Sequence, residues 1–299
     1  MSHRRAETRW FWLFAGPAVV GFVAFNLWPM LYSLWLSFCQ YEVIAPPRFN
    51  GLQNYLYLFT YDPSFWPSVK VTQVFTAVQV PVAILSALAL ALLLNQPVRG
   101  RGFWRAVYFL PSILPQAAFA VVFGYIFQAD GGLLNRALAL AGIHGPAWTT
   151  SPTWALPVLI VVSLWGFGYP MVIFLGGLQN VPRELYEAAH IDGAGAWDRF
   201  RHITLPLISP VIFFNVVMGV ISALKVFDLA YAFSVAQAQP TPGGPARATL
   251  FYGLNLYEQA FGYFHMGLAS AMAWLLFAFI LILTVINFRV GRRWVHYGD

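Results

Sequence analysis

The sequence predicts an all-α polytopic membrane protein with six transmembrane helices and with both termini in the cytoplasm. Its 299 residues are 59% hydrophobic and only 9% charged, whereas soluble domains carry roughly 25% charged residues. So few charges could not cover a surface that faces water, which disfavours the alternative of an unusually apolar soluble enzyme. Six long apolar runs and an uneven distribution of arginine between them point the same way.

Each apolar run is long enough to form one transmembrane helix, because about 20 residues cross the hydrocarbon core of a bilayer. The first run is longer than the roughly 7–15 apolar residues of a signal peptide, and no small-residue cleavage site follows it. We expect it to remain as the first span. The six predicted spans lie near residues 11–37, 71–94, 106–128, 154–178, 207–232 and 267–288.

Basic residues predict the orientation of the spans. With the N-terminus in the cytoplasm, twelve arginines fall in cytoplasmic segments, four basic residues fall outside, and Lys225 lies inside the fifth run. Cytoplasmic loops carry the excess of positive charge in membrane proteins. We therefore expect cytoplasmic tails at 1–10 and 289–299, a membrane domain within 11–294, and a cytoplasmic loop at 179–206 between the fourth and fifth spans.

Prolines in or beside the spans predict kinked helices around a cavity. Backbone groups that a proline frees in lipid must be bonded by neighbouring helices, side chains or water. Ala83, Ala87 and Ala91 repeat at four-residue spacing, which permits close helix contact, although alanine is also simply common in helices. The prolines are Pro17, Pro29, Pro81, Pro111, Pro115, Pro157, Pro170 and Pro210.

Three segments outside the membrane contain turn residues and are expected to be ordered. "FNGLQNY" at 49–55 mixes turn residues with aromatics. "DGGLLNRALALAGIHGPAW" at 130–148 predicts a turn, a short amphipathic helix and a glycine stop. "PTPGGPARAT" at 240–249 is rich in residues that break helices.

The sequence lacks the common signatures of nucleotide, metal and acyl chemistry. Lys70 and Lys225 both follow residues other than glycine, so no phosphate-binding P-loop is present. No histidine is followed by glutamate, as HExxH requires, and no GxSxG occurs. A single cysteine, Cys39, excludes an internal disulfide. We expect no catalytic residue, no metal site and no cofactor in this chain.

Charges deep within a predicted span occur at Lys225 and Asp228, three residues apart on one face of the fifth predicted helix. Charged groups in lipid are functional-site candidates by default, but a neutralising pair that locks the helix into the bundle is equally consistent. A solute cavity needs a few polar groups and aromatic faces. The candidates for such a pathway are Trp165, Tyr169, Asn215, Ser222, Lys225 and Asp228.

One compact charged segment, Glu184–Pro206, separates the fourth and fifth spans and holds eight charged residues or histidines in 23 positions. Pro182 suits the first turn of a helix, Glu187 favours its positive end, and Gly193 suits its stop. "AWDRFRHI" predicts a second short helix, after which Pro206 would open the fifth span. A small knob with a charged rim fits a groove on another protein, but an amphipathic loop lying on the membrane surface is as consistent.

The spacing of this segment resembles the EAA motif of binding-protein-dependent ABC importer permeases. Glu187-Ala188-Ala189 is followed by Gly193, Ile203 and Leu205-Pro206 at the intervals of that motif. Most of the chain is similar to the carbohydrate-uptake branch, and its two ends resemble the first permease subunit of maltose- and glycerol-3-phosphate-type systems. The other similar stretches are "FNGLQNY" (49–55), "LPSILP" (110–115), "DGGLLN" (130–135), "KVFDLAY" (225–231), "GGPARAT" (243–249) and "GLASAMAW" (267–274).

This resemblance implies a MetI-like permease in the cytoplasmic (inner) membrane of a prokaryote, working by alternating access. Its partners would be a second homologous permease in a heterodimer, two ABC ATPase subunits that bind ATP and Mg, an extracytoplasmic solute-binding protein, a sugar substrate and membrane lipid, but no nucleic acid. The charged segment would be the coupling helix that docks on the ATPase. The implied coupling residues are Glu184, Glu187, Ala188, Ala189, Asp192, Gly193, Ile203, Leu205 and Pro206.

Two points stay open in the sequence. Tyr231 and Gly243 are farther apart than the family usually has them, so the end of the fifth span is not fixed. An ion-coupled secondary transporter is the alternative function, although its spans would need more acidic residues to relay a coupling ion. Outer loops at 39–69, 129–153 and 233–262 are expected to meet the solute-binding protein.

Overall fold

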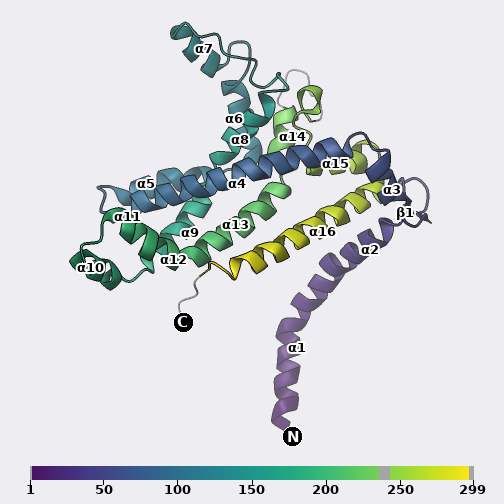
Figure 1. Ribbon diagram of the computed structural model, residues 1–299. Helices are drawn as coiled ribbons and strands as arrows, with labels where there is room; N and C mark the ends of the chain where they lie inside the picture. The colour runs from purple at the N-terminus through teal and green to yellow at the C-terminus, as the bar shows by residue number, and fades with distance from the viewer. Residues whose placement is uncertain (1, 236–242, 296–299) are drawn as a thin grey trace. The chain divides into compact units, whose positions relative to one another are not determined.

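The structure is a computed structural model that describes residues 2–235 and 243–295, with side chains from residue 10 onward. The described residues form helices, apart from one two-stranded hairpin, and Figure 1 traces their order. The chain divides into two compact units. The first contains residues up to 62 together with 256–278, and the second contains 63–255 together with the residues from 279 onward.

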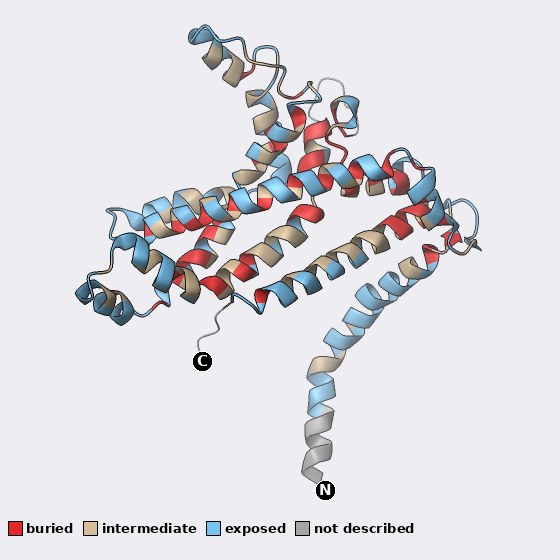
Figure 2. Cartoon of the chain, viewed as in Figure 1, coloured by how far each residue is buried: buried red, intermediate tan, exposed pale blue. Residues whose placement is uncertain are grey.

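Apolar helices at the N-terminus make up much of the first unit. In Trp10–Leu36, the most apolar window of 18 residues has a mean hydropathy of 1.6 and none of it is buried, as the pale blue of this part of Figure 2 shows. An apolar surface this extensive faces lipid or another protein. The elements of this unit are α1 (Ser2–Phe22), the π-helix η1 (Val23–Leu27), α2 (Trp28–Leu36), β1 (Cys39–Gln40), β2 (Arg48–Phe49), α3 (Gln53–Thr60), the π-helix η5 (Glu258–Gly262) and the first part of α16 (Met266–Gly291).

The segment 49–55 is ordered, as its sequence predicts. The buried amide of Asn54 donates hydrogen bonds to the carbonyl oxygens of Ser37 and Cys39, both over 2.9 Å. Tyr55 donates its hydroxyl to the Ser37 hydroxyl over 2.8 Å. The bond to Ser37 satisfies a carbonyl that the end of α2 leaves free, and the bond to Cys39 fixes α3 against the β1–β2 hairpin. Burial also raises the pKa of the Cys39 thiol.

The second unit contains the remaining helices. Its elements are α4 (Phe65–Asn95), α5 (Arg101–Phe109), the 3-10 helix η2 (Leu110–Ile113), α6 (Gln116–Ile126), α7 (Leu133–Leu140), α8 (Ala155–Leu164), α9 (Gly168–Gln179), α10 (Arg183–Ile191), α11 (Ala196–Arg199), the π-helix η3 (Phe200–Thr204), α12 (Leu205–Leu207), α13 (Ser209–Leu224), α14 (Asp228–Val235), the 3-10 helix η4 (Pro245–Arg247), α15 (Tyr252–Tyr257) and the end of α16.

Two of the predicted spans are bent pairs of helices. The run from α5 through η2 meets α6 at 97°, and α8 meets α9 at 43°. The first bend lies at Pro115, which supports the prediction of proline-kinked helices, whereas Trp165, Gly166 and Phe167 form the second. Four helices of the described chain are long and apolar enough to cross a membrane, and the number rises to six if each bent pair is one span.

The fifth predicted span contains a break that the sequence did not reveal. α13 ends at Leu224 and α14 begins at Asp228, so Lys225 and Asp228 do not lie on one face of one helix. That prediction is wrong because the backbone leaves the helix at residues 225–227. No proline or glycine stands at this point, so the apolar pattern alone resembled a continuous helix.

The ends of several predicted segments differ from the observed helices. The predicted N-terminal tail 1–10 is helical from Ser2, and α16 continues to Gly291, into the predicted C-terminal tail. α14 extends to Val235. The long interval between Tyr231 and Gly243 includes residues 236–242, which lie outside the described residues.

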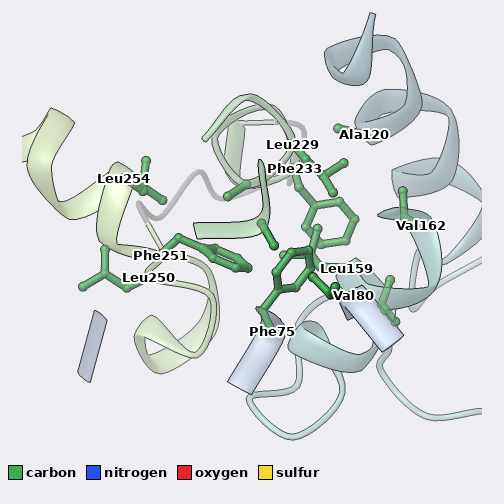
Figure 3. Packing of buried hydrophobic residues seen from close by; sticks show 13 residues of the cluster. Phe75, Val80, Ala120, Leu159, Val162, Leu229, Phe233, Leu250, Phe251 and Leu254 are labelled. Carbon is green, nitrogen blue, oxygen red and sulfur yellow. The ribbon is translucent and has the colours of Figure 1, made fainter. Parts of the chain in front are cut away.

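One apolar core of the second unit joins α4, α6, α8 and α14 to the segment before α15. Phe75 and Phe251 meet edge to face with their ring centroids 5.0 Å apart, and Leu159 and Phe233 are buried beside them. Figure 3 shows these side chains converging from separate parts of the chain. Between membrane helices, such close van der Waals packing replaces hydrophobic burial as the source of association.

A second core joins α4 to α9. Ala87 and Ala91 are fully buried there and contact the cluster that includes Met171 and Phe174. The four-residue spacing of these alanines therefore permits the close helix contact that it predicted. Small side chains let two helix backbones approach, which strengthens packing in lipid.

The segment 130–148 folds into a turn and a short helix, as predicted. α7 ends with Gly142 at φ +75°, and Ile143 N–H donates to the carbonyl of Leu138 over 3.0 Å. The left-handed backbone at this stop suits glycine. Trp148 Nε1 donates to Asn135 Oδ1 over 2.6 Å, which holds the end of the segment against α7.

Two glycines of α9 provide a test of how closely this helix packs against the rest of the second unit. A Cβ added at Gly168 would lie 2.4 Å from the carbonyl oxygen of Tyr108, whereas one added at Gly176 would meet nothing within 4 Å. Because a backbone carbonyl cannot move aside cheaply, we expect Gly168→Ala to destabilise the protein by about 1–3 kcal/mol. Gly176→Ala should be neutral or slightly stabilising, since alanine is the better helix former. Thermal unfolding in detergent measures both, and equal melting temperatures would contradict the packing.

Candidate functional site

The charged segment begins with α10, which carries the first half of the EAA-like motif. Pro182 precedes this helix in an extended conformation, with φ −60° and ψ 131°, and does not occupy its first turn. Glu184 lies in the first turn and His190 in the last. The carboxylate of Glu184 suits the helix dipole, which favours anions at the N-terminus.

α10 stops at Gly193, as predicted. Gly193 adopts φ +79°, its N–H donates to the carbonyl of His190 over 3.1 Å, and Ala194 N–H donates to the carbonyl of Ala189 over 2.9 Å. This pair of bonds is the Schellman arrangement that satisfies the last free carbonyls of a helix. A Cβ at Gly193 would meet nothing within 4 Å, so backbone conformation and not space requires glycine here.

The second half of the segment is more irregular than predicted. The expected second helix is a single turn, α11, which passes into the π-helix η3 and then into the three-residue helix α12. Pro206 lies within α12, and α13 begins only at Ser209. The prediction that Pro206 opens the fifth helix is therefore wrong, because the chain leaves the helix at Ile208, between α12 and α13.

The residues of the motif divide into two groups by exposure. Ile203 is half-buried and packs on the second apolar core. Ile191, which the sequence analysis did not single out, is 86% exposed at the end of α10. The exposed members are Glu184, Glu187, Ala188, Asp192 and Gly193, and the half-buried members are Ala189, Ile203, Leu205 and Pro206. The first group thus faces outward, and the second is directed toward the helix bundle.

A cavity of about 510 Å³ lies within the second unit, bordered by α4, α6, α8, α9, α13 and the start of α14. Five of the six predicted pathway residues line it, namely Tyr169, Asn215, Ser222, Lys225 and Asp228. Trp165 does not. Its ring is 51% exposed and meets Phe123 edge to face at 5.6 Å.

Three helix breaks of the second unit border this cavity. Leu114, Gly166 and Val226 come from the breaks between η2 and α6, between α8 and α9, and between α13 and α14, and each lines it. At membrane depth, irregular backbone is tolerated only where protein buries it or where it lines a water-filled cavity. The breaks therefore place irregular backbone and polar side chains at the wall of this cavity.

The rest of the lining is largely apolar and aromatic. Further polar groups come from Gln79, Ser112, Gln116 and Ser163, which the sequence analysis missed. Only one sequence feature pointed to any of these residues, since Ser112 and Gln116 lie on either side of Pro115, where the helix breaks. Apolar walls with a few polar groups are typical of sites for small molecules.

The buried Asn215 uses its amide within its own helix, donating to the carbonyl of Val211 over 2.9 Å. Ser112 and Ser163 donate their hydroxyls to the carbonyls of Phe109 and Ile160 over 2.6 and 2.7 Å. These bonds hold the three side chains in place at the cavity wall. Within the described residues, no group of three His, Cys, Asp or Glu side chains is arranged to hold a metal ion.

Residues 79–296 match the family described as "Binding-protein-dependent transport system inner membrane component". The chain belongs to this family. It is a multi-pass permease of the bacterial inner membrane and not the ATPase of its transport system. Membership also removes the alternative of an ion-coupled secondary transporter.

The permease is 42% identical to the "Probable ABC transporter permease protein YesP" of Bacillus subtilis (strain 168), over 95% of this chain and 91% of that protein. It is 35% identical to the "Lactose transport system permease protein LacF" of Rhizobium radiobacter, over 94% of each chain. Its fold matches a chain of a bacterial ABC transporter involved in the import of the acidic polysaccharide alginate, with a TM-score of 0.83 over 98% of this chain and 99% of that chain, at 21% identity.

The stop at Gly193 gives a local prediction. Alanine at φ +79° is disfavoured by about 1–2 kcal/mol, so Gly193→Ala should fray the end of α10 and speed hydrogen exchange of the Ala188–Ala194 amides by about tenfold. Asparagine tolerates the left-handed region, so Gly193→Asn should change exchange much less. Hydrogen-exchange mass spectrometry of the detergent-solubilised permease makes the comparison. Equal exchange in the two variants would show that the positive φ does not govern this stop.

Proposed function

We propose that this permease is the first of two permease subunits of an ATP-driven ABC importer, and that it forms part of the pathway for a sugar or oligosaccharide. The observation that carries the proposal is the cavity at which three helix breaks meet. Its aromatic and apolar walls suit the faces of a sugar ring, and its polar side chains suit sugar hydroxyls. The relative named for lactose transport supports this substrate class.

In this proposal, Asn215 and Ser222 offer neutral polar groups to the solute, and Tyr169 offers an aromatic face. Lys225 and Asp228 stand at the break before α14, where both side chains are exposed to the cavity. Trp165, which stands apart from the cavity lining, is left out of the pathway. Alternating access would open this space to one side of the membrane at a time.

The coupling role belongs to α10 and to the turn that follows it. The exposed group of the motif offers two small residues, Ala188 and Gly193, among the carboxylates of Glu184, Glu187 and Asp192. A helix with this surface fits a groove on a partner protein, and we assign that partner as the ATPase subunit. ATP and Mg would be bound by the two ATPase subunits.

The other partners follow from the same system. A second homologous permease would complete a heterodimer, and an extracytoplasmic solute-binding protein would deliver the sugar to the outer loops. The proposed orientation keeps the N-terminus, the segment 179–206 and the C-terminus in the cytoplasm, in agreement with the arginine distribution. Lipid would surround the apolar helices.

The proposed function is tested on the complex co-purified through this chain and reconstituted in proteoliposomes. ATP hydrolysis is measured with lactose, maltose, sn-glycerol 3-phosphate or an alginate oligosaccharide, each with and without the solute-binding protein. Stimulation by one compound that depends on the binding protein would support the importer and identify its solute class. Transport driven by an ion gradient alone, with no associated ATPase, would overturn the proposal.

Charge reversal on α10 tests the coupling role. We expect Glu187→Arg and Gly193→Pro to abolish solute uptake while the permease stays folded, because each changes the docking surface and not the cavity. Asp198→Arg makes the same charge change in α11, outside the motif, and should leave most of the uptake. Uptake and ATP hydrolysis are measured together in proteoliposomes. Normal ATP-driven uptake by either Glu187→Arg or Gly193→Pro would refute the assignment.

Filling the cavity tests the pathway. Ser222→Trp adds a large ring to a residue that lines the space of about 510 Å³, and we expect uptake to fall by about tenfold or more because a blocked pocket loses its bound solute. Val217→Trp, five residues earlier on α13 and absent from the lining, is the matched control. If both variants transport equally well, the solute does not pass through this cavity.

A further inference from the structure

One side-chain hydrogen bond joins the two halves of the coupling segment. The hydroxyl oxygens of Tyr186 on α10 and Thr204 in η3 are 2.8 Å apart. Thr204 is only 5% exposed, and Tyr186 is half-buried and packs on the second apolar core. The two residues are 18 positions apart, so this contact bridges the whole turn that contains Gly193.

The direction of the bond follows from proton counting. The Thr204 hydroxyl also donates to the carbonyl of Arg199, over 3.4 Å. A hydroxyl has one proton to donate and two lone pairs to accept, so the Tyr186 hydroxyl is the donor to Thr204. The result is a short chain of hydrogen bonds that runs from α10 through η3 to the end of α11.

The inner end of this chain is fixed to the bundle. The backbone carbonyl of Thr204 accepts a hydrogen bond from the N–H of Ile208 over 3.0 Å. Ile208 is fully buried in the second core, beside Met171 and Phe174 of α9, and it immediately precedes α13. α13 in turn supplies part of the cavity wall. Two hydrogen bonds, Tyr186–Thr204 and Thr204–Ile208, therefore connect α10 to the residue that immediately precedes α13.

The contact ends in a π-helix, η3, which is one of three π-helices in the described chain. π-helices are rare, well under 1% of residues, and their single turns are frequent at functional sites. η3 spans Phe200–Thr204 and ends at the bonded threonine. A hydrogen bond between partly buried groups is strong and directional, because little water competes for it.

We propose that Tyr186 and Thr204 are positioning residues that transmit the displacement of α10 to α13. This inference rests on the proposed coupling function and names the contact through which that function acts. The outward residues of the motif would receive the movement of the ATPase, and the Tyr186–Thr204 bond would carry it inward. Without the bond, α10 would follow the ATPase while α13 and the cavity wall lag behind.

Removal of single hydroxyl groups tests the contact. Tyr186→Phe and Thr204→Val each delete the bond with little change in shape, whereas Thr204→Ser keeps the hydroxyl and should restore function. Tyr108→Phe is the matched control, since Tyr108 packs on the same core and makes no side-chain hydrogen bond in the described chain.

The experiment measures how nucleotide changes the accessibility of one cavity residue, and it can be done before the solute is known. Cys39 is the only cysteine, so Cys39→Ser combined with Met218→Cys leaves one thiol, at a cavity-lining position that is 47% exposed. Its reaction rate with N-ethylmaleimide is measured in the reconstituted complex with binding protein, with and without Mg-ATP and orthovanadate. ATP hydrolysis is followed in parallel.

We expect ATP hydrolysis to persist in Tyr186→Phe and Thr204→Val, but the nucleotide-dependent change in labelling rate should shrink by about threefold or more, as loss of one buried hydrogen bond allows. Thr204→Ser and Tyr108→Phe should respond like the background. The double variant Tyr186→Phe/Thr204→Val should be no worse than Thr204→Val alone, because the Tyr186–Thr204 bond is already lost in that single variant.

One result would contradict only the positioning role of Tyr186 and Thr204, and another would contradict the coupling role of the whole segment. An equal nucleotide response in Tyr186→Phe, Thr204→Val and Tyr108→Phe would remove the positioning role and leave the proposed importer intact. If the background itself shows no nucleotide-dependent labelling although its ATPase subunits hydrolyse ATP, the coupling role of this segment fails as a whole.

Discussion

The need to satisfy every backbone hydrogen bond in an apolar medium shapes the second unit of this permease. Regular helix meets that need wherever the chain faces lipid or packed side chains. The helix is interrupted at Pro115, at Gly166 and at residues 225–227, and each interruption borders the same cavity. Irregular backbone and a cavity with polar side chains therefore occur together, whereas α4 of the same unit continues as one regular helix.

Small residues allow the helices of the second unit to pack closely against one another. Ala87 and Ala91 let α4 approach α9, and Gly168 lets the start of α9 approach the backbone at Tyr108. Where lipid is as apolar as the side chains, close approach is the main source of helix association. The segment proposed for coupling packs on the resulting core through Tyr186 and Ile203.

The segment proposed for coupling contributes to two surfaces with one motif. Glu187 and Gly193 belong to its exposed half, which suits contact with another protein, whereas Ile203 and Pro206 belong to the half that enters the bundle. Between these two groups, Gly193 ends α10 with a positive φ, and the π-helix η3 leads into α12 ahead of α13. Tyr186 and Thr204 are 18 positions apart in the sequence, but their hydroxyl oxygens lie only 2.8 Å apart in the fold.

The sequence by itself determined the membrane class, the apolar helices, the glycine stop at Gly193 and the family, because composition, periodicity and motif spacing are local properties. It also named five residues that line the cavity. Only the tertiary structure decided the break at 225–227, the π-turn at η3 and the position of Trp165 outside the cavity. These depend on which backbone groups find partners in neighbouring helices, and no local pattern of residues records that.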